Sequence, residues 1–333
     1  MLARATAGKG APPRSVPRRV AAGFFACAAP DLDFVFGFFG PAEYVLNHRG
    51  ITHSLLLMPL WALPLAWLLA KILREPGGWR ALYGTCVMAI GAHIAGDWIT
   101  SFGTMVLAPL SDWRAALGTT FIIDLWFSGI IVLGLAFSAL FYRTGIPSVA
   151  ALILLCAYVG FQYLQKEKAL EFGARYAAAH GLRNVDIAAH PRAVSPFNWT
   201  VFVSDERVHR FAHINLVRET PRPYVPGDGF VARLDAPFEP LASAHWQTRT
   251  RYGEGQVAKE AWESPALDFF RWFAERPALE AATRGPECYW FIDLRFLNPG
   301  RDWVPFRFGA CRDGPQARWH AFERGEGAAK RVD

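Results

Sequence analysis

The sequence predicts an α-helical integral membrane domain of about five spans, followed by a soluble α+β domain. The 333 residues are enough for two domains. Residues 20–165 are mostly apolar, whereas residues 166–333 hold most of the charged side chains and six of the nine histidines. The mean hydropathy of the whole chain, +0.14, is high for a soluble protein. These observations together predict a membrane part and a polar part.

Five apolar segments account for the membrane domain, and each is close to the roughly 20 residues that cross a bilayer core. The third is longer and is expected to be tilted, or broken at one of its glycines. A basic, proline-rich tail precedes the first span over residues 1–19. A signal peptide is excluded because the first apolar run carries Pro30, Asp31 and Asp33. The predicted spans are residues 20–40, 52–71, 80–108, 121–142 and 146–165.

Lysine and arginine side chains predict the orientation of the spans, because they gather in cytoplasmic loops. They lie in the N-terminal tail, in or beside residues 72–79, and in residues 143–145, which are therefore expected inside. Residues 41–51 and 109–120 are then outside. The fifth span delivers the soluble domain, 166–333, to the outside, although two lysines just after that span oppose this last step.

The net charge of +6 raises the question whether the chain binds an anionic partner such as lipid or nucleic acid. In a membrane protein, such a charge reflects loop topology and attraction to anionic headgroups. The sequence has no basic run with interleaved aromatic side chains. Membrane lipid is therefore the expected partner, and no nucleic acid is predicted.

The polar part is expected to fold as a separate α+β domain. Residues 166–180 continue the last span as a helix. Residues 197–217 read as two strands around a Ser-Asp-Glu turn, and 289–297 and 303–311 as two further strands. Residues 257–275 have apolar side chains at helical spacing.

Five cysteines without a CxxC pair do not indicate a zinc ribbon. Cys27, Cys86 and Cys156 fall in apolar runs and are most simply packing residues. Cys288 and Cys311 lie in the polar part, where they can form a disulfide if that part faces an oxidising compartment.

Ionisable side chains inside apolar spans are costly and usually functional. On the expected orientation, histidines and aspartates from four segments reach the outer half of the membrane or its outer surface. Their common depth indicates a shared site. The set is Asp31, Asp33, His48, His53, His93, Asp97 and Asp124.

The spacing within two motifs determines whether their side chains can converge. His93 and Asp97 in GAHIAGD are four residues apart, which places both on one helix face and suits ligands of one metal ion or of a close metal pair. Asp31 and Asp33 in PDLD would point about 200° apart on an ideal helix. Pro30 disfavours a regular helix there, so both can face inward if the backbone opens or a helix starts at that point.

The block HRGITHS, residues 48–54, immediately precedes the second apolar run. Its two histidines need a turn between them, and Gly50 allows one. Alone, the block could be an interfacial loop in which Thr52 caps a helix and Arg49 meets a headgroup. A single membrane histidine or aspartate is likewise often a buried hydrogen-bonding residue, and PDLD alone could be a loop tip with helix-capping aspartates.

Three histidines and four aspartates at one depth favour a metal site over these separate explanations. Nitrogen and carboxylate ligands together suit zinc, manganese or iron. The sequence therefore predicts a divalent metal ion, zinc or alternatively manganese or iron, held by side chains of this set.

The motifs PDLD, HRGITHS and GAHIAGDWITSFGT, in this order between apolar helices, resemble the YdjM-like family of LexA-binding, inner-membrane-associated proteins assigned as metal-dependent hydrolases. The resemblance covers residues 20–140, and HRGxTHS is its most specific part. The family is distantly similar to zinc-dependent phospholipase C. That similarity implies that His53, His93, Asp97 and one or both of the PDLD aspartates are ligands, with His48 and Asp124 as ligands or their supporting groups.

One feature departs from the family pattern. Members usually carry a Thr-His-Ala segment a few residues after the initiator methionine, and this chain starts MLARATAGKG. Either its start lies upstream or one ligand is absent.

A membrane-embedded, metal-dependent hydrolase is the first functional hypothesis. Metal would activate a water, Asp33 or Asp124 would orient that water or act as the base, and Arg49 would hold an anionic phosphate. A site at the outer headgroup level favours a phosphoester or lipid-linked substrate. The alternative is a non-enzymatic membrane protein with a structural His/Asp metal site and a partner-binding soluble domain. A transporter is disfavoured because no inverted repeat is detectable.

Overall fold

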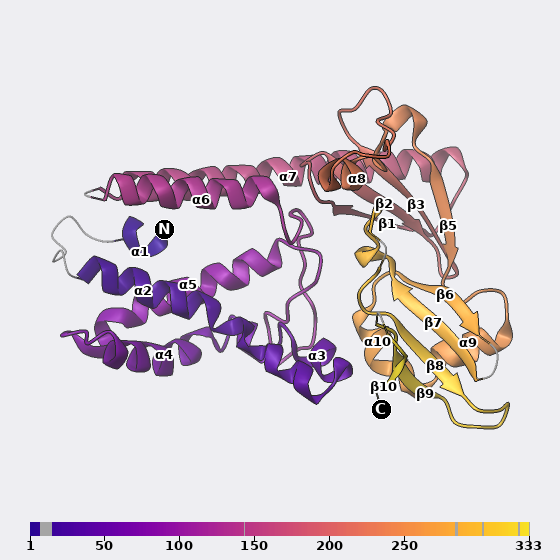
Figure 1. Ribbon diagram of the computed structural model, residues 1–333, viewed down its shortest axis with the longest axis horizontal. Helices are drawn as coiled ribbons and strands as arrows, with labels where there is room; N and C mark the ends of the chain where they lie inside the picture. Colours follow the sequence, from indigo (N-terminus) through magenta and orange to yellow (C-terminus); the bar gives the residue numbers. More distant parts are fainter. Residues whose placement is uncertain (7–14, 143, 284–285, 302, 326, 333) are drawn as a thin grey trace. The chain divides into compact units, whose positions relative to one another are not determined.

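The computed structural model describes residues 1–6, 15–142, 144–283, 286–301, 303–325 and 327–332. It divides into two compact units, each considered by itself (Figure 1). The helical unit comprises Met1–Val35 and Asn47–Tyr163, and the α+β unit comprises Phe36–Leu46 and Leu164–Asp333. Part of the basic tail expected over residues 1–19, residues 7–14, lies outside the described residues.

The helical unit is held together by small side chains. Helix α2 (Ser15–Ala28), helix α4 (Met58–Ile72) and helix α5 (Gly78–Trp98) share one apolar core. Buried alanines recur at a spacing of four residues, which lets the helix backbones approach closely. These alanines are Ala22 and Ala26 on α2 and Ala62, Ala66 and Ala70 on α4.

Two more helices pack together through small and polar groups. Helix α6 (Leu125–Leu140) meets the first half of helix α7 (Ile146–Ala179). The hydroxyl oxygens of Ser138 and Ser148 lie 2.7 Å apart. A Cβ atom on Gly134 would come within 2.5 Å of the Ala151 side chain, so glycine permits the contact. The short helix α1 (Leu2–Ala5) donates a hydrogen bond from the Arg4 guanidinium to the Ser138 carbonyl.

Two helical segments are long and apolar enough to cross a membrane, Ser15–Phe39 and Ile146–Ala179. The first joins α2 to the 3-10 helix η1 (Pro30–Phe39). A third candidate is the pair Pro41–His53 and Met58–Ile72, which is bent by 81°. Among the described residues the structure therefore supports two or three candidate spans rather than the five that hydropathy alone predicts.

The third predicted span, residues 80–108, ends earlier than expected. Helix α5 stops at Trp98, and the chain then follows an irregular course in which Thr104 bridges Ala115. Gly103 adopts a φ of +91°, which a helix cannot accommodate. The fourth predicted span is also shorter, because α6 has 16 residues.

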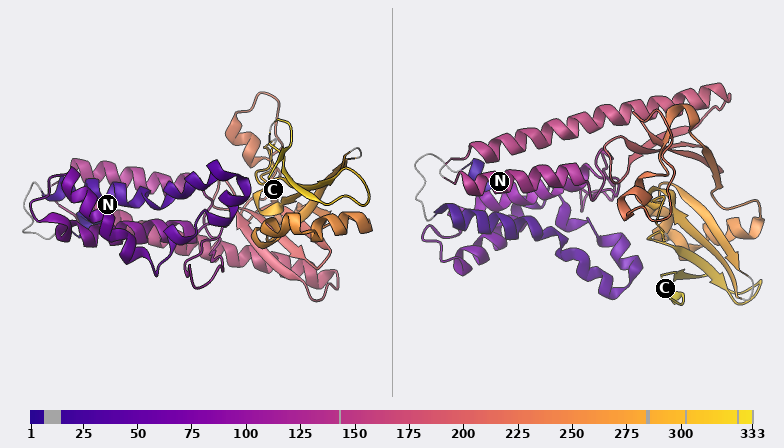
Figure 2. Two further views of the ribbon diagram at one scale, coloured as in Figure 1. Left: turned by 90° about the horizontal axis from the view of Figure 1, so that it is seen from below. Right: turned by 45° about the horizontal axis from the view of Figure 1, so that its top comes forward.

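Helix α7 is one continuous helix of 34 residues, as expected from the apolar run and its polar continuation (Figure 2). In its second half, Gly173 lies directly against the first sheet. A Cβ atom there would be 2.8 Å from Val201 and 2.9 Å from Ile187. Glycine at this position therefore allows the helix to lie close to the strands.

The first sheet contains the expected hairpin. Strands β1 (Asp186–Pro191), β2 (Asn198–Ser204) and β3 (Val208–Asn215) pair antiparallel in sequence order. Strand β4 (Glu239–Pro240) pairs parallel with β3, and β5 (Trp246–Thr250) pairs antiparallel with it. The turn between β2 and β3 lies where the sequence predicts it.

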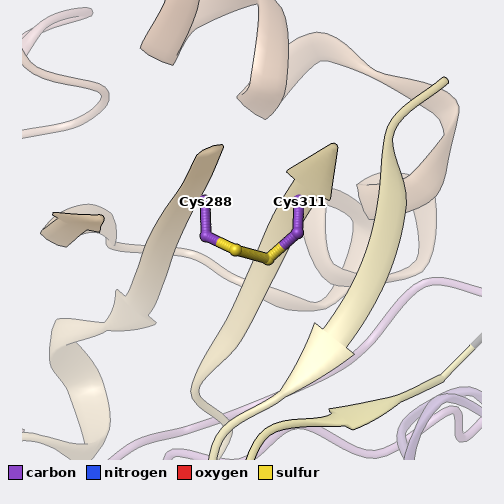
Figure 3. The surroundings of a disulfide bond; sticks show 2 residues. All are labelled: Cys288 and Cys311. Carbon is purple, nitrogen blue, oxygen red and sulfur yellow. A yellow bond between two sulfur atoms is a disulfide. The ribbon is translucent and has the colours of Figure 1, made fainter. Parts of the chain in front are cut away.

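The second sheet is antiparallel throughout and has the order β10-β9-β8-β7-β6. Its strands are β6 (Pro277–Thr283), β7 (Glu287–Asp293), β8 (Phe308–Arg312), β9 (His320–Glu323) and β10 (Lys330–Arg331). Cys288 of β7 lies opposite Cys311 of β8, and the two form a disulfide (Figure 3).

Three predicted elements of the α+β unit differ from the structure. The strand expected over residues 289–297 ends at Asp293, where the 3-10 helix η5 (Leu294–Phe296) follows. The helix expected over residues 257–275 is broken into α9 (Gln256–Glu263) and α10 (Asp268–Phe273). Pro265 starts a short 3-10 turn between them, because proline disfavours a helical conformation in the residue before it. The strand expected over residues 303–311 begins only at Phe308.

The two faces of the first sheet have different characters. One face packs its apolar side chains, including Trp199 and Ile214, against Ala169 of α7. On the other face, Phe202 and Phe211 pack with apolar side chains of the second sheet. The core of the α+β unit therefore comprises a layer between α7 and the first sheet and a layer between the two sheets.

Candidate metal centre

The first two candidate ligands come from the start of η1. Helix α2 ends at Ala28, and Pro30 begins the 3-10 helix. A 3-10 helix has three residues per turn, so side chains two positions apart are separated by about 120°, against about 160° (200° counted the longer way) in an α-helix. Asp31 and Asp33 can therefore both contact the histidines that follow, Asp31 reaching His53 and Asp33 reaching His48.

The HRGITHS block forms a tight turn that presents its histidines. Arg49 has a φ of +59°, and a Cβ atom on Gly50 would lie 2.7 Å from the Asn47 carbonyl oxygen. Glycine is therefore required at position 50. The short 3-10 helix η2 (Ile51–His53) follows and buries His53 completely.

Four side chains bring their donor atoms together. Five of the six distances between the ligand atoms are between 3.1 and 3.5 Å. A tetrahedron of ligands about 2.0–2.1 Å from a zinc ion has edges of about 3.3 Å. The separations therefore match one tetrahedral ion. The four atoms are Asp31 Oδ1, His53 Nε2, His93 Nε2 and Asp97 Oδ2.

The Asp97 carboxylate supports this interpretation. Its Oδ2 atom is buried and accepts no hydrogen bond from the residues that the structure describes. The same atom lies 3.1 Å from His53 Nε2 and 3.4 Å from His93 Nε2. A buried carboxylate oxygen without a hydrogen-bond donor is costly, and a cation between these three atoms would satisfy it. The residues present therefore fit a metal ion.

A second group of possible ligands adjoins the first. Asp31, Asp33 and His48 also place one ligand atom each within 4.8 Å of one another. Asp31 belongs to both groups.

Asp33 connects the two histidines of HRGITHS. Its side chain is fully buried, and its Oδ1 lies 2.7 Å from His48 Nδ1. Its Oδ2 accepts hydrogen bonds from the Arg49 amide at 3.0 Å and the Thr52 hydroxyl at 2.9 Å, and lies 3.3 Å from His53 Nδ1. A carboxylate at Nδ1 turns the other ring nitrogen of His53 toward a metal.

Arg49 holds the opposite side of the centre. Its guanidinium is buried and forms a 3.0 Å ion pair with Asp97 Oδ1. It also donates to the Thr100 hydroxyl at 2.8 Å and lies over the Phe102 ring. This arrangement fixes Asp97 with its other oxygen toward the histidines.

Asp124 is in neither of the two groups. It caps α6 by accepting a hydrogen bond from the Phe127 amide at 2.8 Å. Both of its carboxylate oxygens also accept from the Tyr158 hydroxyl of α7, at 3.0 and 2.9 Å. Its contacts join α6 to α7.

Two residues at the centre were missed as site residues in the sequence. Thr52 and Thr100 contact Asp33 and Arg49 respectively. Thr52 lies within HRGITHS and Thr100 within GAHIAGDWITSFGT, so their place in these motifs was the only signal for them.

Access to the first group is asymmetric. The side chain of Asp31 is 57% exposed, whereas those of His53, His93 and Asp97 are buried or nearly so. A molecule approaching the four donor atoms would meet Asp31 first.

Comparisons with known proteins agree with these motifs. The model of the family described as "YdjM inner membrane protein" matches residues 1–169, which include every residue of both groups. The chain is also similar to the "Uncharacterized protein YfhP" of Bacillus subtilis (strain 168), with 29% identity over 133 residues. This match covers 40% of this chain and 39% of that relative. No solved structure matches the chain.

Proposed function

The chain belongs to the YdjM inner membrane protein family, and on that premise we propose that it is a membrane-bound, metal-dependent hydrolase. The observation that carries the proposal is the convergence of two imidazole nitrogens and two carboxylate oxygens from three segments of the helical unit. Half-exposed Asp31 leaves this cluster accessible, as a catalytic site requires.

Zinc is the metal that this donor set favours. Two histidine nitrogens and two carboxylate oxygens at tetrahedral separations suit zinc, while manganese and iron accept the same ligand types. Asp31, His53, His93 and Asp97 would hold the first ion. Asp33 and His48, with the shared Asp31, would hold a second ion where the site is dinuclear.

The bound metal would supply a Lewis acid and a water that is acidified for attack on the substrate. The protein would contribute orientation and proton transfer. Asp33 holds the rings of His48 and His53 through their Nδ1 atoms. Of the two aspartates expected as the proton acceptor, Asp33 is the nearer to the ligands, because it lies 3.3 Å from His53 Nδ1 whereas Asp124 is in neither group.

The contacts of Arg49 favour a role other than the phosphate binding that we expect from the sequence. Its guanidinium is already paired with Asp97 and Thr100. This pairing favours a positioning role for Arg49, in which it sets the angle of the Asp97 carboxylate. Capture of a substrate phosphate by Arg49 would require those contacts to be exchanged.

A phosphoester or a lipid-linked molecule at the outer headgroup level is the substrate class we propose. The family location in the inner membrane and the candidate spans support a lipid environment. The Cys288–Cys311 disulfide supports an oxidising, extracytoplasmic location for the α+β unit. With the N-terminus inside, as the basic tail predicts, three spans would place the α+β unit outside, so this location requires the bent pair to count as one span.

A structural metal site is the competing function. It would be closed by protein ligands, whereas a catalytic site keeps one position for water. The exposure of Asp31 favours the catalytic alternative, because exchange of one exposed ligand opens such a position.

The test is a hydrolysis screen with the full chain purified in detergent. Phospholipids, lipid-linked phosphates and soluble phosphoesters are incubated with the protein, with and without a chelator. We expect turnover of at least one class that the chelator abolishes and zinc restores. The His93→Ala variant should be inactive, and the His245→Ala variant, altered at an exposed histidine of the α+β unit, should be unaffected. Metal-replete protein without turnover across the screen would support the structural alternative.

A further inference from the structure

Exposed large apolar side chains are confined to one region of the described part of residues 165–333. Phe230 is 64% exposed and Trp303 is 50% exposed. Apolar patches that water contacts mark surfaces that bind a partner or a membrane. We call residues 217–232 the apolar loop. Its exposed large side chains are Val217, Tyr224, Val225, Phe230 and Val231, and Trp303 lies outside it in sequence.

The apolar loop projects from a fixed base. Asn215, the last residue of β3, accepts hydrogen bonds through Oδ1 from the amides of Val217 and Arg218. The Arg218 guanidinium pairs with Asp235 at 2.5 Å, which ties the start of the loop to the end of helix α8 (Phe230–Asp235). These contacts fix the two ends of the apolar loop, and most of its exposed side chains lie between them.

Trp303 adds to the same surface. A Cβ atom on Gly300 would lie 2.6 Å from the Arg233 carbonyl oxygen, so the chain just before Trp303 lies directly against α8. Tryptophan and tyrosine are the side chains enriched where proteins meet the headgroup layer of a membrane. Tyr224 and Trp303 give the surface that character.

The contacts of α7 show which end of the α+β unit carries the apolar loop. A Cβ atom on Gly173 would meet Val201 in the middle of β2, and Ile187 and Val203 near the β2–β3 turn. One helical turn earlier, Ala169 packs with Trp199 and Ile214, close to the other end of the strands. Going back along α7 toward its apolar half thus leads toward the end of β3, where the loop begins.

The length of α7 indicates which of its residues lies where the helix leaves the hydrocarbon core. At 1.5 Å per residue, about 20 residues from the start of the helix cross the roughly 30 Å hydrocarbon core. Counted from Ile146, that distance ends near residue 165, and the first charged side chains of the helix are Lys166, Glu167 and Lys168. Ala169, which shares a core cluster with Ile214 near the end of β3, is only four residues beyond residue 165, so the base of the apolar loop would lie near the point where α7 leaves the bilayer.

We propose that the apolar loop and Trp303 insert into the headgroup layer of the bilayer that α7 crosses. Val225, Phe230 and Val231 would enter the outer edge of the hydrocarbon, with Tyr224 and Trp303 among the headgroups and Arg222 at the phosphates. The loop would thereby fix the α+β unit against the membrane surface. This inference rests on α7 as a span and is independent of the proposed hydrolase activity.

Site-specific photocrosslinking tests the proposal on the full chain. A benzophenone amino acid replaces Val225 or Phe230, one at a time, in protein reconstituted singly into nanodiscs of phosphatidylethanolamine and phosphatidylglycerol. Glu206, exposed in the β2–β3 turn, is the matched control for water, and Ile153, 64% exposed on the apolar half of α7, is the control for lipid. Because Val225 and Phe230 are exposed, the replacements should leave the fold intact, and the Cys288–Cys311 disulfide reports this in the same sample.

The yield of lipid adducts after irradiation gives the result. We expect yields at positions 225 and 230 closer to that at position 153 than to that at position 206. Yields at 225 and 230 equal to the yield at 206, while position 153 captures lipid, would overturn the proposal. Capture of a second copy of the chain in place of lipid, in discs loaded with two copies, would overturn it as well.

Discussion

The Nε2 atoms of His53 and His93 lie 3.1 Å apart, although 40 residues separate the two histidines in sequence. Two imidazole nitrogens at this distance share either a proton or a cation. Here the carboxylate oxygens of Asp31 and Asp97 lie within 3.5 Å of both nitrogens. Two anions around two imidazoles favour a shared metal cation at the centre of the four atoms.

Asp33→Asn should weaken metal binding without removing a ligand of the first group. The carboxylate holds His48 and His53 at Nδ1, and loss of such a supporting partner typically costs roughly 10- to 100-fold in metal affinity. Competition with a fluorescent chelator measures the affinity. Asp112→Asn, at an exposed aspartate outside both groups, is the control. Equal affinities in the two variants would show that Asp33 does not orient the ligands.

Arg49→Gln separates two roles for this arginine. If Arg49 positions Asp97, as the 3.0 Å ion pair indicates, the variant should bind metal less tightly, and Arg49→Lys should restore part of the affinity. If Arg49 instead holds the substrate, metal affinity should stay at the wild-type level while KM for an anionic substrate rises. Metal titration and steady-state kinetics on the same samples distinguish these outcomes, and we expect the first.

The α+β unit should lose stability in acid. Burial lowers the pKa of His209 to about 4 and that of His213 to about 3, whereas an unfolded histidine titrates near pH 6.5. The unfolded state therefore binds more protons below pH 6.5, so the free energy of unfolding falls as pH decreases toward the folded pKa values. For His209 the loss approaches about 3 kcal/mol below pH 4.

Urea-dependent hydrogen exchange of peptides from β2 and β3 measures this pH dependence in the full chain. The urea midpoint should fall less steeply in the His209→Gln variant between pH 6.5 and pH 4, which are the unfolded and folded pKa values of His209. His245→Gln, at an exposed position, should leave the fall unchanged. A midpoint independent of pH over this range in the wild-type chain would contradict the buried, neutral state of His209.

The disulfide predicts a simple thiol count. Unreduced, denatured protein should react with a thiol reagent at Cys27, Cys86 and Cys156, and all five cysteines should react after reduction. Replacing Cys288 and Cys311 with serine should lower the stability of the α+β unit by about 3 kcal/mol, because the bridge closes a loop of moderate length. Five reactive thiols before reduction would show that the bridge is absent.

Periodic features of the fold could be predicted from the sequence. His93 and Asp97 share a helix face because four residues nearly complete one turn, and both contact His53 through that face. The β2–β3 turn and the continuation of α7 followed in the same way from local pattern. Each of these depends on residues close in sequence.

Features that depend on an irregular backbone were harder to predict from the sequence. The number of spans was overestimated because apolar runs do not reveal where a helix ends, as at Trp98 before the turn at Gly103. The role of Asp33 as a support for two histidines depends on the Arg49 amide and the Thr52 hydroxyl, which only the folded turn brings to its carboxylate. Likewise, only the meeting of α6 and α7 places Tyr158 at Asp124.

Elemental analysis of the full chain purified in detergent tests the central claim most directly. We expect stoichiometric zinc, or another divalent transition metal, in the wild-type chain and in the His245→Ala control. His53→Ala and His93→Ala should each lose this metal, because each removes one of the four converging donor atoms. Metal content unchanged in both histidine variants would contradict the metal centre.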